Sequence, residues 1–168
     1  MISSDDLPDP RRFTKFHPFI KGVFSQWHPT GFVLDDRAFV TAEQWMMYAK
    51  AVLFGDLDRA EAVLGTDDPG EQKRHGQLVA GFDSQVWDAR KIGIVHRGNF
   101  EKFRQNEGAA RQLRNTAPAM LVEANPRDWV WGAGLAVDDP AVQDPNLWKG
   151  SNLLGRVLTH VRDDLGQV

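Results

Sequence analysis

The stretch Phe39-Val-Thr-Ala-Glu-Gln-Trp-Met-Met-Tyr-Ala-Lys50 carries the clearest structural signal in the chain. Thr41 is suited to cap the start of a helix, and Gln44, three residues later, completes the pattern of a capping box. Glu43 then lies in the first turn, where the positive end of the helix dipole stabilises a charged carboxylate. Lys50 follows about two turns later, so its side chain leaves the same face as Glu43. The stretch predicts a helix with an acid and a base on one face.

Glu43 has two interpretations at this point. A glutamate in a first helical turn is most often a capping or dipole residue, and the following Trp45, Met46 and Met47 are typical of a stripe that faces a core. Carboxylates with perturbed pKa values also gather at active sites. The stretch alone leaves both interpretations open.

The composition limits the class of protein. A chain of 168 residues fits one domain. The absence of cysteine excludes disulfides, thiolate nucleophiles and cysteine zinc sites, and it favours a reducing compartment. A net charge of −3 argues against binding nucleic acid through a broad basic surface, although a local basic groove stays open. The N-terminal residues have neither a basic start nor an apolar run, and no segment reaches the length of a membrane span, so we expect a cytoplasmic protein without membrane contact.

The spacing of apolar residues and the residues at segment ends predict several short elements. Residues 1–12 are rich in Asp and Pro and are expected to form a flexible arm before a single domain over residues 13–168. The expected helices cover residues 42–55, 56–64, a stretch that starts at 69, and residues 82–104, 109–115 and 153–165. The expected strands or short extended segments cover residues 13–16, 22–24, 32–34, 37–40, 120–123 and 129–131, with a hairpin joining the third and fourth.

Tryptophan is unusually frequent, with six residues against one tyrosine. Its flat apolar face suits the wall of a pocket for a planar ring, although filling a core is its more common use. The loop Phe24-Ser-Gln-Trp-His-Pro29 is either a turn around a buried Trp27 or a loop that faces a ligand. Trp129–Trp131 runs into Gly132-Ala-Gly134, where glycines let the backbone approach a ligand closely.

Several common chemistries lack their sequence patterns. The five histidines are scattered without zinc-ligand spacing, and no serine-hydrolase elbow, phosphate-binding loop or dinucleotide fingerprint is present. Neither a metal nor a cofactor is therefore expected. What remains is a set of carboxylates, Glu43, Glu123 and Asp128, in a tryptophan-rich setting. Paired carboxylates suit cleavage of a glycosidic bond, because one can act as acid, base or nucleophile while the other stabilises the developing positive charge.

A series of short motifs also follows one order along the chain. They are Phe24-Ser25-Gln26-Trp27, Thr41-Ala-Glu43-Gln44 through Lys50-Ala51, Phe54-Gly55-Asp56, Trp87 with Arg90, Lys102-Phe103 with Gln105-Asn106, Thr116 with Leu121-Val122-Glu123, Asp128 with Trp131-Gly132, and Trp148-Lys-Gly150-Ser-Asn152-Leu-Leu-Gly155 before a helix ending in Val161-Arg162. Together they span residues 13 to 165 and resemble the NADAR family, the YbiA-like N-glycosidases.

The resemblance implies an α+β fold that is mostly α-helical, a single compact domain with a small β-sheet or hairpin. It also implies an N-glycosidase, a hydrolase acting on N-glycosyl bonds. Members of the family are linked to phosphorylated ribosylamino-pyrimidine intermediates of riboflavin biosynthesis, and others to the removal of ADP-ribose from guanine in nucleic acid. The implied partner is a nucleotide-like small molecule or an ADP-ribosylated nucleic acid, and no oligomeric state is assigned. The alternatives are a non-catalytic ADP-ribose or NAD sensor and a structural protein with a blocked pocket.

The resemblance assigns roles by position. Glu43 is implied as the catalytic carboxylate, Trp87 as a stacking wall and Asp128 as a second polar contact to ribose or base. The implied substrate-binding residues are Phe24, Gln26, Trp27, Lys50, Arg90, Trp131, Gly132 and Asn152. Two positions depart from the family pattern, because Gln26 stands where Asn is often found and Ser151 where Lys is often found. If that lysine contacts phosphate, its replacement changes phosphate affinity or substrate choice.

Overall fold

The helix expected after Thr41 is present. In the computed structural model, which describes residues 1–166, helix α1 spans Ala42–Leu53. Thr41 Oγ1 accepts a hydrogen bond of 3.0 Å from the Gln44 N–H, and Gln44 Oε1 accepts one of 2.9 Å from the Val40 N–H. The Thr41 side chain therefore caps the helix as expected, while Gln44 accepts from the residue before the N-cap and not from Thr41 itself as in a regular capping box. Residues 167 and 168, the last two of the expected domain, lie outside the described part of the chain.

The chain folds into two compact units. The first contains Met1 and Gln26–Asn106, and the second contains Ile2–Ser25 and the chain from Glu107 onward. Within residues 1–166, six α-helices accompany two small sheets of two strands each. This composition confirms the expected α+β, mostly helical class.

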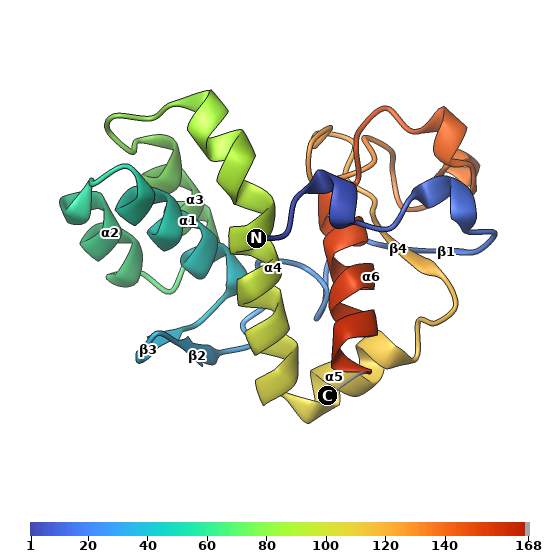
Figure 1. Ribbon diagram of the computed structural model, residues 1–168, viewed down its shortest axis with the longest axis horizontal. Helices are drawn as coiled ribbons and strands as arrows, with labels where there is room; N and C mark the ends of the chain where they lie inside the picture. Colours follow the sequence, from blue (N-terminus) through green and yellow to red (C-terminus); the bar gives the residue numbers. More distant parts are fainter. Residues whose placement is uncertain (167–168) are drawn as a thin grey trace. The chain divides into compact units, whose positions relative to one another are not determined.

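The first unit is built around α1 and the long helix α4. Figure 1 shows α1 grouped with two short helices beside α4, and a hairpin follows below them. The other elements are β2 (Phe32–Leu34), β3 (Arg37–Phe39), α2 (Leu57–Leu64), α3 (Pro69–Gln77) and α4 (Ser84–Gln105). β2 and β3 pair antiparallel with Phe32 opposite Phe39. None of the helices within residues 1–166 is both long enough and apolar enough to cross a bilayer.

Close packing of α1 against α4 depends on a glycine. The indole Nε1 of Trp45 donates a hydrogen bond of 2.7 Å to the carbonyl oxygen of Ile94 on α4. A Cβ atom added to Gly98, one turn further along α4, would lie 2.2 Å from Trp45 Cδ1. Gly98 therefore marks a close contact between the two helices. Phe39 packs its ring edge against the same indole and joins the hairpin to this core.

The second unit joins the two ends of the chain. Strand β1 (Phe16–Phe19) pairs in parallel with β4 (Met120–Glu123), and α6 (Leu153–Leu165) packs on β4. Met120, Leu121 and Val122 are fully buried, so β4 lies at the centre of this unit. The remaining elements are α5 (Glu107–Arg114) and four 3-10 helices at Ser4–Asp6, Pro10–Arg12, Pro140–Gln143 and Pro145–Leu147.

The strand expected at Trp129–Trp131 is wrong. This segment is an irregular loop whose carbonyl groups accept hydrogen bonds from the start of α6 and the residues before it. Ser151 N–H donates to Trp129 at 2.9 Å, and Leu154 N–H donates to Trp131 at 3.0 Å. The first N–H groups of a helix have no acceptor within the helix. The carbonyl oxygens of this loop accept from them and so are not available for pairing with a strand.

Two other expectations near the N-terminus differ from the structure. Residues 22–24 lie in turns rather than in an extended segment. Residues 1–12, expected as a flexible arm, form two 3-10 helices, and Leu7 is only 5% exposed. The Arg156 guanidinium on α6 donates hydrogen bonds to the carbonyl oxygens of Pro8 and Ser4 at 3.0 and 3.1 Å. A long-range cation thus supplies contacts that the local composition does not reveal.

Candidate active site

Glu43 is buried at the start of α1. The residue is 7% exposed, and its backbone N–H donates a hydrogen bond of 3.0 Å to the carbonyl oxygen of Gln26. A first-turn N–H needs an acceptor from outside the helix, and the loop before the hairpin provides it here. The carboxylate of a nearly buried residue is thus placed at the positive end of a helix dipole.

Lys50 connects Glu43 with Trp87. Burial lowers the pKa of the Lys50 ammonium, and the negative charge of Glu43 opposes this shift. The Lys50 Nζ lies 4.6 Å from the ring centroid of Phe82 and 5.5 Å from that of Trp87. Both distances are within the range of cation–π attraction. An acid, a base and a partly exposed indole are therefore neighbours in the first unit.

Gln26 links the site to α4 through a residue that the sequence reasoning missed. Its Oε1 accepts a hydrogen bond of 2.9 Å from Nδ2 of Asn99, which also donates to the Val95 carbonyl oxygen. Asn99 is fully buried, and its Oδ1 has no hydrogen-bond partner within residues 1–166. A buried amide oxygen of this kind is costly, so it marks a place where a water molecule or a ligand group would be stabilised.

Lys102 is a second polar residue that was not assigned to the site. It lies one turn beyond Asn99 on α4 and is fully buried, and this burial lowers the pKa of its ammonium to about 7. Its charge, together with burial, lowers the pKa of His28, whose ring nitrogen lies 2.7 Å from the Thr30 hydroxyl. The signal available in the sequence was the pair Asn99 and Lys102, spaced by three residues among apolar neighbours on the core face of a helix.

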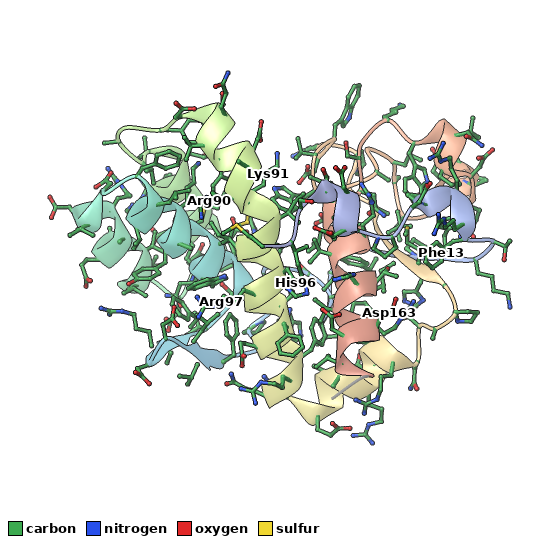
Figure 2. The ribbon with its side chains drawn as sticks, viewed as in Figure 1. Phe13, Arg90, Lys91, His96, Arg97 and Asp163 are labelled. Carbon is green, nitrogen blue, oxygen red and sulfur yellow. The ribbon has the colours of Figure 1, made fainter. Side chains whose placement is uncertain are left out.

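Trp27 and Arg90 are the other two predicted binding residues of the first unit, and Trp27 directly follows Gln26, whose carbonyl oxygen accepts the Glu43 N–H. Trp27 is 46% exposed, so it is not the buried tryptophan that one interpretation of its loop required. Arg90 lines a pocket formed by α1, α4 and the hairpin. Figure 2 shows Arg90 and Arg97 on the side of α4 that faces α1.

Asp128 shapes a tight loop in the second unit. Its Oδ1 accepts hydrogen bonds from the N–H groups of Val130 at 3.0 Å and Trp131 at 2.8 Å. A Cβ atom on Gly132 would lie 2.8 Å from the Asp128 carbonyl oxygen, so only glycine fits this approach. Trp131 is partly exposed beside it. Asp128, Trp131 and Gly132 therefore form one local structure, in which Oδ2 of Asp128 has no hydrogen-bond partner among the described residues.

Asn152 and Phe24 lie in the interior of the second unit. Asn152 is fully buried with a positive φ of 49°, and its amide accepts from the Glu123 N–H and donates to the Leu121 carbonyl oxygen. It holds β4 against the start of α6, so any effect on a ligand would act through that backbone. Phe24 is 8% exposed and packs edge-on against His17 and Phe19.

The fold matches a solved structure. The NMR structure of the Escherichia coli protein YbiA superimposes with a TM-score of 0.76 over 92% of this chain and 86% of that chain, at 24% sequence identity. The similarity defines an α+β fold of YbiA type.

The family follows from the sequence comparisons. The model of the NADAR domain matches residues 12–166. N-glycosidase R617 of Acanthamoeba polyphaga mimivirus is 38% identical over 147 residues, which cover 84% of this chain and 86% of the relative. Protein irg-1 of Caenorhabditis elegans is 37% identical over 159 residues, covering 85% of this chain and 75% of the relative. The chain belongs to the NADAR family.

Proposed function

We propose that this protein is an N-glycosidase that hydrolyses the bond between a ribose and a base, with Glu43 as its catalytic carboxylate. The observation that carries the proposal is the neighbourhood of Glu43, a carboxylate 7% exposed in a first helical turn, next to Lys50 and through it to the indole of Trp87. The mimivirus relative is named an N-glycosidase, which supports the same reaction class.

The reaction requires a water molecule to attack the anomeric carbon of the ribose. The bond from that carbon to the base nitrogen breaks, its electron pair stays on the base, and a proton completes the free base. Positive charge develops on the sugar in the transition state. Glu43 would either accept the proton of the water or stabilise this charge, and Trp87 would stack on the base or the sugar.

Lys50 has a defined part in this proposal. The Lys50 ammonium and the Glu43 carboxylate attract each other, and this attraction opposes the lowering of the Lys50 pKa by burial. The charged form of Glu43 is the one that can accept a proton or stabilise a cationic sugar. The low exposure of Glu43 strengthens the attraction between the two charges, since water screens buried charges less than exposed ones.

The substrate classes of the proposal are the two that the resemblance implies. One is a phosphorylated ribosylamino-pyrimidine, and the other is ADP-ribosylated guanine in nucleic acid. The chain carries a net charge of −3, which favours the small metabolite, because a nucleic acid gains affinity from a basic surface. A pocket that reads a modified base needs no such surface, so both classes belong in the test.

The test is incubation of the protein with each substrate class, with mass spectrometry of the free base and the ribose product. We expect release of base from one class by the parent protein and a rate lower by about 10²–10⁴-fold in Glu43→Gln, which keeps the shape and removes the charge. Equal rates for parent and variant would show that Glu43 is not the catalytic group. Tight binding of ADP-ribose without release of product would instead identify a sensor.

A further inference from the structure

A pocket of about 520 Å³ lies on the side of α1 opposite to Glu43. Its α1 wall contains Trp45, Tyr48, Ala49 and Val52, which follow the three- and four-residue spacing of one helical face. Glu43 precedes Trp45 by two residues, which is about 200° around the helix axis. The volume falls within the range of small-molecule sites, roughly 300–1,000 Å³.

Three guanidinium groups line this pocket against one carboxylate. Arg37 comes from β3, Arg90 and Arg97 come from α4, and the carboxylate belongs to Asp35 in the hairpin turn. Arg97 donates two hydrogen bonds to Asp35, at 2.6 and 3.0 Å, so this pair is compensated. Within residues 1–166, no carboxylate lies in ion-pair distance of Arg37 or Arg90. Two uncompensated cations therefore line one pocket.

Arg37 and Arg90 are each held by a contact with a neutral side chain. The Arg37 guanidinium carbon lies 5.6 Å from the ring centroid of Tyr48, and Nη1 of Arg90 donates a weak hydrogen bond of 3.9 Å to the Met1 sulfur. Stacking on a ring or contact with a thioether restricts the guanidinium without using up its charge. A guanidinium group binds two phosphate oxygens at once through two parallel N–H groups.

The other walls are apolar. Ala49, Val52 and Ile94 line the pocket together with the edge of the Trp45 indole. Val52 is 44% exposed, so its apolar surface faces solvent at this wall. An inorganic anion alone would leave this apolar area in water, whereas an apolar body attached to the anion would cover it.

We propose that this pocket is a second binding site, which takes a phosphate monoester with a flat apolar body. The phosphate binds between Arg37 and Arg90, and the body lies on the apolar wall of α1. Because the pocket and Glu43 lie on opposite faces of α1, the proposal does not depend on N-glycosidase activity.

The test uses 1-naphthyl phosphate, which has no N-glycosidic bond and is not a substrate of the proposed reaction. Titration is followed by the indole N–H signals of the protein in NMR. The Trp45 signal reports on the pocket, because its Nε1 is bonded to the Ile94 carbonyl oxygen beside it. The Trp148 signal serves as the internal control, since its Nε1 donates to the Val142 carbonyl oxygen in the second unit. We expect the Trp45 signal to shift with a dissociation constant of about 1 mM or lower.

Ligand and protein variants separate the two parts of the site. 1-Naphthol lacks the anion and inorganic phosphate lacks the body, and each is expected to bind at least about tenfold more weakly, as expected for losing a charge-assisted bond or apolar burial. Arg37→Gln and Arg90→Gln are each expected to weaken the binding of 1-naphthyl phosphate by a similar factor. Arg104→Gln is the matched control, because Arg104 lies on α4 and pairs with Glu101 outside the pocket.

Circular dichroism of each variant shows that the comparison is made on folded protein. A shift of Trp148 without Trp45 would overturn the proposal, and so would unchanged affinity in both Arg37→Gln and Arg90→Gln. Equal affinity for 1-naphthyl phosphate and 1-naphthol would also overturn it, because the arginines would then contribute nothing.

Discussion

Glu43 and Gln26 are joined by a hydrogen bond of 3.0 Å between the Glu43 N–H and the Gln26 carbonyl oxygen. The side chain of Gln26 extends the connection to α4, where Asn99 donates to its Oε1 at 2.9 Å. The backbone of Glu43 is therefore held from a loop and from a second helix. A carboxylate that must meet a sugar at a defined distance benefits from such a fixed backbone.

Replacement of Gln26 by Ala is the first prediction. The variant loses the bond to Asn99 and releases the loop that accepts the Glu43 N–H. Misplacement of a catalytic group by about 1 Å costs up to about 100-fold in rate, so we expect a lower kcat with a smaller change in KM. Steady-state kinetics on the substrate identified by mass spectrometry measures this.

The matched control for that variant is Gln105→Ala. Gln105 also binds across the first unit, since its amide accepts from and donates to the Val33 backbone at 2.8 Å. Both variants are expected to lose about 0.5–1.5 kcal/mol of stability per hydrogen bond. An equal fall in kcat in both variants would show that general loosening, and not the position of Glu43, causes the effect.

Local signals explain which parts of the fold were predictable. The start of α1 was predicted because Thr41, Gln44 and the apolar face that follows lie within a few residues of each other. The parallel pairing of β1 with β4 was not, because Phe16 and Met120 are distant in sequence and no local pattern encodes their register. The loop at Trp129 was mistaken for a strand because alternating apolar residues are also found where carbonyls meet a helix start.

The site shows the same division. Glu43 and Lys50 were placed on one face by helix geometry alone, whereas Trp87 entered through the resemblance and lies beside Lys50 in the structure. Asn99 and Lys102 were missed although they are spaced by three residues on one helix face, because the sequence does not show that this face is buried. Their burial and pairing exist only after α4 has packed.

The indole of Trp87 supplies the second prediction. If it stacks on the base, its loss should weaken substrate binding by about 1–3 kcal/mol, which is the usual range for base–aromatic stacking. We expect KM to rise from the parent protein to Trp87→Phe and again to Trp87→Leu, because phenylalanine keeps a smaller aromatic face and leucine keeps none. Phenylalanine also keeps part of the contact with the Lys50 ammonium. A Leu variant with the same KM as the Phe variant would contradict stacking.

A glycine pair tests the packing of α1 on α4. Gly98→Ala places a methyl group 2.2 Å from Trp45 Cδ1, and the indole cannot move without breaking its bond to Ile94. We expect a loss of about 1–3 kcal/mol in the free energy of unfolding, the usual cost of overpacking. In Gly108→Ala the added methyl meets no atom within 4 Å, and we expect a gain of up to about 1 kcal/mol from helix propensity. Urea unfolding of both variants measures the difference.

Lys102 makes stability depend on pH. Burial lowers the pKa of its ammonium to about 7 in the folded protein, whereas the unfolded chain has the ordinary value of about 10.4. Between these values the unfolded chain binds more protons than the folded one, so the free energy of unfolding rises as pH increases from about 7 to about 10. The half-buried Lys50, whose pKa is also lowered, adds to this slope in the same direction.

Lys102→Met isolates the contribution of this amine, since methionine is apolar and flexible enough to fill the space. Urea unfolding between pH 7.5 and 9 avoids His28, whose lowered pKa places its titration below that window. We expect the free energy of unfolding of the parent to rise by up to about 1.4 kcal/mol per pH unit more than that of the variant. The reason is that the unfolded parent binds up to one proton more than the folded parent in this pH range. Lys73→Met, on the exposed face of α3, serves as the control and should keep the parental slope, because an exposed amine stays hydrated in both states. Parallel slopes for the parent and Lys102→Met would mean that Lys102 keeps its proton inside the fold, held by polar groups that offset its burial.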